Sequence, residues 1–253
     1  MGLYLGKDKI SALRTIEKTV PSMKAYLEAG GKCGYNNAVS FEGCWLVSDW
    51  ENVNDCSRMF YNCSIITSIP NMNTSKVTNM GYMFSNCSRL TSVPAMDTSK
   101  VTNMTYMFYY CSSLTSIPSM DTSKVTNMST MFGACSSLTS IPSMDTSKVT
   151  DMSSMFGACS SLTSIPSMDT SKVTDMGYMF TNCSNLESIH MHGTKVSFDI
   201  SASTKFTREA LVEILNNLAT VTTSPTLTMG STNLAKLTDA DKAIATGKGW
   251  KLA

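Results

Sequence analysis

The nine cysteines of this chain are its residues best suited to nucleophilic or metal chemistry. Six of them recur at intervals of 24 residues: Cys63, Cys87, Cys111, Cys135, Cys159 and Cys183. No CxxC pair is present, and a zinc site would need cysteines or histidines at closer spacing. Equivalent side chains of stacked repeats run parallel, whereas a disulfide needs Cβ atoms that face each other. We therefore expect reduced, buried thiols with a structural role.

Two histidines, His190 and His192, are the other side chains that suggest metal chemistry. On a strand they would share one face, and they could hold a metal together with a third ligand. Because no pattern of Cys, Asp or Glu lies near them, we favour the interpretation that both are surface residues. The sequence has no GxSxG or P-loop motif, and serines that recur in every repeat cannot each be a nucleophile. We expect no enzyme activity, no cofactor and no metal.

Acidic and basic side chains follow the same interval in two columns. The aspartates are predicted turn residues, whose carboxylates accept hydrogen bonds from the backbone amide two residues on; calcium binding is the less favoured alternative. A column of lysines repels itself unless water or opposite charge offsets it. We expect the aspartates to offset the lysines, with contact to an anionic polymer as the alternative. The columns are Asp97, Asp121, Asp145 and Asp169, and Lys76, Lys100, Lys124, Lys148 and Lys172.

The interval itself predicts the fold that must position these side chains. A Met-Phe pair precedes each of the six cysteines by the same offset, and five prolines keep the register: Pro70, Pro94, Pro118, Pro142 and Pro166. A period of this length is typical of a solenoid, because one such unit cannot bury its apolar side alone. The sequence therefore predicts an elongated repeat solenoid with coils stacked about 4.8 Å apart.

Each coil is predicted to have four parts. In the coil that contains Cys111, residues 114–118 form a short strand, residues 121–123 a polar turn, and residues 125–128 a second extended segment. The Met-Phe-x-x-Cys portion at 107–111 is predicted to be a tight helical turn. Leu, Ile, Val, Met, Phe and Cys should point inward, and Ser, Thr, Asp and Lys should face solvent.

The two ends depart from the period and are predicted to be helical or mixed caps. Residues 1–48 form the N-terminal cap, with a helix at 20–31, or alternatively a segment that docks onto another protein. Residues 49–196 form the solenoid. Residues 197–253 form the C-terminal cap, or alternatively an oligomerisation region. This cap has a helix over 207–218, a strand at 226–229 and a last helix that begins at Thr238, ends at Gly247 and precedes a packed Trp250.

Composition restricts the classes of partner. Charged residues make up 15% of the chain and the formal net charge is +1, so no basic field exists to hold nucleic acid. No apolar run is long enough to span a bilayer. Residues 1–20 lack the apolar segment of a secretory signal, so we expect no export signal of this chain's own.

The unit MFxxCSSLTSIPSMDTSKVTNM resembles the BspA-like leucine-rich repeats of bacterial, mycoplasmal and protozoan surface proteins, over residues 49–196. The resemblance implies a right-handed leucine-rich-repeat solenoid and a role in adhesion or binding. It implies neither catalysis nor a set of binding residues. The opening six residues and the segment 234–250 are similar to ends of phage tail-associated and gut bacterial repeat proteins. A virion or cell-surface location is therefore favoured.

The informative residues are those that differ between otherwise similar coils. Positions beside the Met-Phe pair vary freely, and this tolerance predicts that their side chains point outward. Tyrosine there suits binding because it combines apolar area with a hydroxyl; neutral drift is the alternative. The predicted binding residues are Tyr82, Tyr106, Tyr109 and Tyr110.

We expect these four tyrosines to form an exposed patch that binds a protein or a cell-surface glycan. Their replacement should leave stability nearly unchanged. The rival function is that of a soluble effector that inhibits a bacterial host protein.

Overall fold

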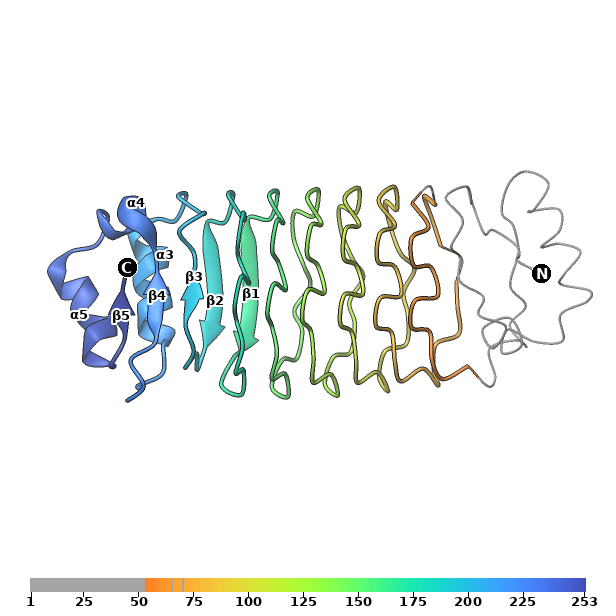
Figure 1. Ribbon diagram of the computed structural model, residues 1–253, viewed down its shortest axis with the longest axis horizontal. Helices are drawn as coiled ribbons and strands as arrows, with labels where there is room; N and C mark the ends of the chain where they lie inside the picture. The colour runs from red at the N-terminus through yellow and green to blue at the C-terminus, as the bar shows by residue number, and fades with distance from the viewer. Residues whose placement is uncertain (1–52, 65, 70) are drawn as a thin grey trace, which may run out of the picture.

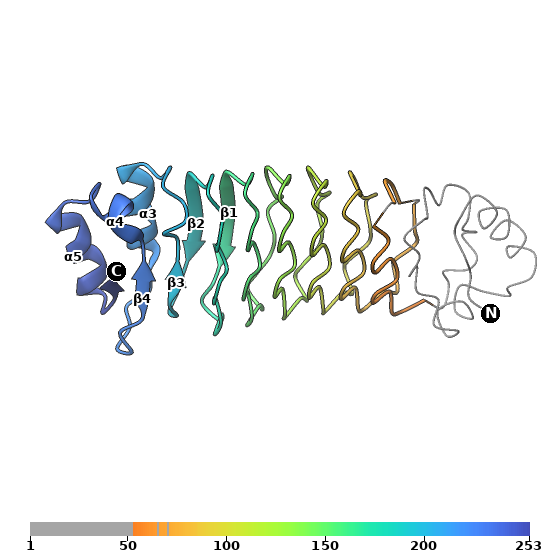
Figure 2. The same cartoon turned by 45° about the horizontal axis from the view of Figure 1, so that its top comes forward.

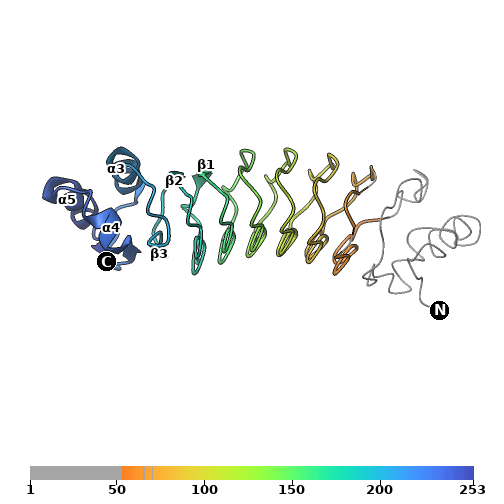
Figure 3. The same cartoon turned by 90° about the horizontal axis from the view of Figure 1, so that it is seen from above.

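The computed structural model describes residues 53–253 except 65 and 70. Within that part the coils stand side by side along the long axis, and helices gather at the C-terminal end (Figure 1). In Figures 2 and 3 each coil is a thin layer that faces only the coil before it and the coil after it. The expected N-terminal cap at 1–48, its helix at 20–31 and Cys33 and Cys44 lie outside the described residues.

A column of parallel β-bridges joins the coils at one residue each. It runs through Asp55, Asn79, Asn103, Asn127, Asp151 and Asp175, with a register of one full repeat per step. The extended segment expected at 125–128 is therefore present, but it pairs with each neighbouring coil through a single β-bridge. The repeat solenoid predicted from the interval is confirmed.

The Met-Phe-x-x-Cys segment is a ladder of turns, so the predicted helical turn is wrong. Tyr106 and Tyr110 have φ of 56° and 58°, whereas an α-helix needs negative φ throughout. Backbone amides alternate between two acceptors: Met107 N donates to Met104 O within the coil at 3.2 Å, and Phe108 N donates to Met131 O of the next coil at 2.9 Å. Every second amide thus ties one coil to its neighbour.

The core contains the predicted inward residues. It also contains a column of threonines that were expected to face solvent and are instead buried: Thr74, Thr98, Thr122, Thr146 and Thr170. Phe60, Phe84, Phe108, Phe132, Phe156 and Phe180 are all buried and stack along the axis, with ring centroids 5.4 to 6.0 Å apart. Each cysteine from Cys87 to Cys183 is buried, and its thiol donates to a phenylalanine carbonyl of the preceding coil, as Cys135 Sγ does to Phe108 O at 3.1 Å. The expectation of buried, reduced thiols is confirmed for the described cysteines, which form no disulfides.

The strand expected at 114–118 is absent, and its counterparts form only near the C-terminal end. There β1, Ser164–Asp169, pairs in parallel with β2, Ser188–His192. Earlier coils carry a proline at the position equivalent to His190, and proline has no amide hydrogen to donate to a β-ladder. In β2 His190 takes the place of that proline, and the ladder can form.

The C-terminal region continues the stack with helices. Strands β3 (Phe198–Asp199), β4 (Thr226–Thr228) and β5 (Lys251–Leu252) form a parallel sheet. The helices are α3, Arg208–Asn217, α4, Gly230–Leu234, and α5, Asp239–Gly247. None of the helices in the described part of the chain is long and apolar enough to cross a membrane.

Most of the expected local structure in this region is confirmed. Thr207 caps α3 by accepting from Ala210 N, and Thr238 and Asp241 form the capping box of α5. Trp250 is buried and donates from Nε1 to Ala219 O at 2.9 Å. Helix α4 was not predicted. It also missed Lys248, whose ammonium group donates to three carbonyls at the C-terminal end of α3: Leu215, Asn216 and Leu218.

Candidate functional site

The turn ladder carries three columns of side chains, which pass through Arg58, Tyr61 and Asn62 of the first described coil. Small members such as Ser85 and Thr130 are buried, whereas Arg58 and Tyr110 are exposed. Each column contains one residue per coil, and these residues vary between coils; other differences, such as Arg89 against Ser113, lie elsewhere in the repeat. In three successive coils the columns hold a cluster that we call the aromatic strip. It comprises Arg58, Tyr61, Tyr82, Tyr106, Tyr109 and Tyr110.

Ring contacts connect the whole strip. The Tyr82 and Tyr106 rings stack with centroids 4.7 Å apart and an interplanar angle of 5°. The Tyr106 and Tyr109 rings pack in a T-shaped arrangement with centroids 5.4 Å apart, and the Tyr109 and Tyr110 centroids lie 6.3 Å apart. The structure therefore brings together all four tyrosines that the sequence singled out, because parallel stacking places equivalent positions side by side.

Two further members of the strip were not predicted. The Tyr61 and Tyr82 rings pack in a T-shaped arrangement with centroids 6.4 Å apart, and the Arg58 guanidinium carbon lies 5.1 Å from the Tyr82 ring centroid. Both occupy the same columns one coil earlier, so the repeat register was the signal that could have found them. A guanidinium over an aromatic face is attracted by the ring's negative quadrupole.

The strip is less open than expected, because its rings cover one another. Tyr110 is 49% exposed, while Tyr82, Tyr106 and Tyr109 are half-buried. Stacked aromatic pairs contribute about 0.5–1.5 kcal/mol beyond the burial of area. Replacing the four tyrosines should therefore cost measurable stability, in contrast to the sequence-based expectation.

The variable positions are constrained by the backbone as well. Arg58, Tyr82, Tyr106 and Tyr110 all have φ between 56° and 59°, a left-handed conformation that is uncommon for residues other than Gly and Asn. Asparagine fills the Tyr110 position in three other coils, as Asn62, Asn86 and Asn182. Tyr110 thus stands where a smaller residue would have been easier to accommodate.

Tyr109 depends on a small neighbour. A Cβ atom built on Gly133, the equivalent residue one coil later, would lie 3.2 Å from Tyr109 Cδ2 and 2.8 Å from Thr130 Cγ2. At the equivalent Gly157 of the next coil, the nearest atoms would be 3.4 Å away or more. Glycine at 133 therefore leaves room for the tyrosine ring.

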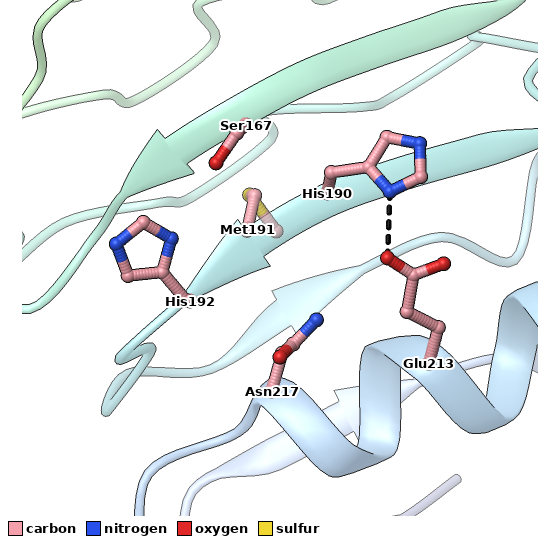
Figure 4. A pocket seen from close by; sticks show the side chains of 6 residues that line it. All are labelled: Ser167, His190, Met191, His192, Glu213 and Asn217. Atoms are coloured by element: carbon pink, nitrogen blue, oxygen red, sulfur yellow. Dashed lines mark hydrogen bonds and ion pairs between the residues drawn. The ribbon is translucent and has the colours of Figure 1, made fainter.

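The histidines line a separate hollow of about 530 Å³ between β1, β2 and α3. His190 Nδ1 lies 2.7 Å from Glu213 Oε1, and His192 is set apart from that pair (Figure 4). Ser167 and Asn217 complete the polar lining. Among the described residues, no three His, Cys, Asp or Glu side chains are placed to hold a metal ion together.

The aspartate column behaves as predicted. Asp97 Oδ1 accepts from Ser99 N at 3.0 Å and from the Ser99 hydroxyl at 2.7 Å, and the amides of Ser123, Ser147 and Ser171 donate in the same way to the three other aspartates. The bonds from Ser99 hold the pKa of the Asp97 carboxyl below its usual value, and Lys100 lowers it further. The lysine column is exposed along its length.

The comparisons with known proteins identify a family. The sequence model of the family described as "Mycoplasma protein of unknown function, DUF285" matches residues 35–139 and 113–210, and the chain belongs to this family. The match supports the BspA-like leucine-rich repeat resemblance. The crystal structure of the leucine-rich repeat protein of T. pallidum is similar at 15% identity and a TM-score of 0.42, over 79% of each chain. No curated protein matches the sequence.

Proposed function

We propose that this protein is a non-enzymatic binding scaffold, and that the aromatic strip is the surface it presents to a macromolecular partner. One observation carries the proposal: side chains from three coils make an unbroken series of ring contacts outside the core, which ends at the exposed Tyr110. The core does not need these residues, since later coils have Thr, Ser, Gly and Ala in the same columns.

The residue types and their rigidity support binding. Tyr and Arg are enriched among the few residues that dominate the energy of protein interfaces. Tyrosines that already pack on one another lose little conformational freedom when a partner arrives, and this lowers the entropic cost of association. A solenoid with a fixed backbone ladder holds such a surface in place before binding.

The chemistry of the described residues supports a role without catalysis. Nucleophilic thiols are buried, and burial raises the pKa of the Cys135 thiol to about 12, which keeps it protonated. The repeated aspartates are engaged by the hydroxyls and amides of their own turns. Side chains that recur in every coil form no unique group of the kind an active site requires.

We further propose that the protein works as a phage tail-associated or bacterial surface component, as the resemblance of its repeats and ends suggests. The rival is a soluble effector that binds and inhibits a bacterial host protein. Probing purified phage particles and surface fractions of the source cells with an antibody separates the two. Signal in particles or at the surface supports the first, and signal confined to the lysate of infected or producing cells supports the rival.

The binding surface is tested by copying one coil onto another. The triple variant Tyr106→Ser, Tyr109→Gly, Tyr110→Ala takes its residues from Ser154, Gly157 and Ala158, which have the same backbone conformation two coils later. We expect the variant to fold with a modestly lower unfolding temperature. Attachment to target cells, measured by flow cytometry of the labelled protein, should fall at least about tenfold.

The control is Tyr178→Ser, which removes an exposed tyrosine from the same column as Tyr82 and Tyr106 but outside the strip. This variant should attach as the parent protein does. Undiminished attachment of the folded triple variant would show that the strip is not the binding surface.

A further inference from the structure

Arg58 forms one end of the aromatic strip, and its guanidinium group has no ion-pair partner in the part of the chain that the structure describes. Its side chain is exposed and stacks on Tyr82, and no carboxylate among the described residues pairs with it. The closest acid in sequence, Asp55, is engaged elsewhere: its Oδ1 accepts from Ser57 N at 2.7 Å, and its Oδ2 accepts from Asn79 Nδ2 at 3.4 Å. The guanidinium donors of Arg58 thus face solvent in a fixed position.

The rest of the strip is uncharged. The three turns over 58–62, 82–86 and 106–110 contain no acidic residue and no base other than Arg58. Beside the tyrosines, Asn86 Nδ2 donates to Asn62 Oδ1 at 2.8 Å. The surface therefore offers one cation at its end, tyrosine edges and hydroxyls along its length, and amides at its side.

The covered ring faces argue against sugars and nucleic acid as the partner. Tyr82 has Arg58 over one face and Tyr106 stacked on the other, and this stack also covers one face of Tyr106. Tyr106 and Tyr109 are packed against each other in an edge arrangement. Nucleobases bind aromatic side chains by stacking on open faces, and sugar rings pack on the same faces. A single cation also gives little hold on a chain of phosphates.

We infer that the partner is a protein with an acidic side chain placed against Arg58 and an apolar side chain placed against Tyr109 and Tyr110. This inference rests on the proposed function of the strip. Arginine accepts a carboxylate through two parallel hydrogen bonds, and a guanidinium already positioned by stacking loses little freedom in forming them. Opposite charge at one end of an otherwise neutral surface also fixes the direction in which the partner lies.

The probe is a library of random displayed peptides selected against the full-length protein, together with an array of bacterial and host glycans. Enriched peptides are synthesised, and their affinities are measured for the parent protein and three variants: Arg58→Gln, Arg89→Gln and the triple tyrosine variant. Arg89 is an exposed arginine outside the strip, so its replacement controls for a simple loss of net charge.

We expect the enriched peptides to pair Asp or Glu with an aromatic or aliphatic residue. Their affinity should fall at least about tenfold in Arg58→Gln and in the triple variant, weaken with added salt, and stay unchanged in Arg89→Gln. Peptides without acidic residues, or equal affinity for Arg58→Gln, would overturn the inference and leave the strip as the binding surface. Glycans that bind the parent protein but not the triple variant would likewise overturn the inference and leave the strip as the binding surface. Peptides that bind the triple variant unchanged, or no enrichment in either library, would overturn the proposed function as well.

Discussion

The buried cysteines from Cys87 to Cys183, which we call the thiol ladder, show what a single residue type contributes to this fold. A carbonyl such as Phe108 O accepts from Cys111 N within its own coil and from Cys135 Sγ of the next coil. Serine could donate the same bond but would bury a more polar group, and valine would fill the space without a donor. Cysteine satisfies both needs, since it is small, apolar and a weak donor.

The first prediction concerns the reactivity of these thiols. Cys87, Cys111, Cys135 and Cys159 are fully buried, so iodoacetamide should not label them in the native protein and should label them all after denaturation. Mass spectrometry of the alkylated peptides measures both states. Rapid native labelling of any of the four would mean that the ladder opens or faces solvent.

Alkaline pH should destabilise the protein through the same ladder. Burial raises the pKa of the Cys56, Cys135 and Cys183 thiols to about 12, while the unfolded chain titrates near the ordinary value of about 8.5. Above that value the unfolded state loses protons that the folded state keeps. The free energy of unfolding should therefore decline from about pH 8.5 up to the folded pKa. Urea titrations at pH 7, 9 and 10.5 measure this, and a flat profile would contradict it.

Gly133 and Gly157 form a matched pair that tests the packing of Tyr109. Gly133→Ala should displace the Thr130 methyl group and the Tyr109 ring, since the new Cβ would lie 2.8 Å from Thr130 Cγ2 and 3.2 Å from Tyr109 Cδ2. We expect a loss of about 1–3 kcal/mol from such overpacking. Gly157→Ala meets only ordinary contacts and should cost less. Chemical denaturation measures the free energy of unfolding of both variants. Equal losses of this free energy would count against the proposed role of Gly133.

At the scale of the element, the turn ladder takes the place of a regular helix in each described coil. Each turn donates alternately inside its coil and to the next coil, so the backbone is satisfied without regular secondary structure. The phenylalanine stack lies directly behind this ladder. Its side chains should therefore be the most costly to remove.

Phe132→Ala tests that expectation in a middle coil. Phe132 is fully buried and stacks between Phe108 and Phe156 at 5.7 and 5.8 Å. Its truncation should cost about 3–5 kcal/mol. Lys124→Ala, on the exposed polar turn of the same coil, should change the free energy of unfolding by less than about 0.5 kcal/mol. Similar losses in the two variants would refute the assigned orientation of the coil.

At the scale of the whole molecule, the described coils form a one-dimensional array. Hydrogen bonds between coils run from one coil to the next, with separations of 22 to 27 residues in the repeats. Residues 112–135 and 136–159 differ at two positions only: Asn127/Asp151 and Thr130/Ser154. A whole coil is therefore exchangeable, and stability should be a sum of coil and interface contributions.

Deletion of residues 136–159 should give a folded protein. The cut joins Cys135 to Ser160 and restores the Cys-Ser sequence and every column of the ladder. Cooperative unfolding by circular dichroism should persist with a lower free energy of unfolding. Deletion of 136–147 removes half a coil and places polar turn residues against the core, so that variant should not fold. Failure of the whole-coil deletion alongside folding of the half-coil deletion would contradict a modular array.

The sequence by itself determined whatever depends on local pattern and period. The recurrence of Cys, Met-Phe and Pro predicted the solenoid and its inward residues, and Asp97 and its equivalents had the pattern of turn residues that bond two positions on. Thr207 and Thr238 predicted the starts of the two longer C-terminal helices, because helix capping depends on residues that are close in sequence. The boundary placed at residue 197 stays a prediction.

Tertiary structure alone decided what depends on contacts between coils. The left-handed backbone at Tyr106 and Tyr110 arises because amides must reach the next coil, and the local sequence does not show this. The stack of Arg58, Tyr82 and Tyr106 exists because parallel coils superimpose positions 24 residues apart at ring-stacking distance. The ammonium group of Lys248 reaches the end of α3 from a segment about 30 residues away. Such contacts form when the chain is packed, since only packing sets the distance between residues far apart in sequence.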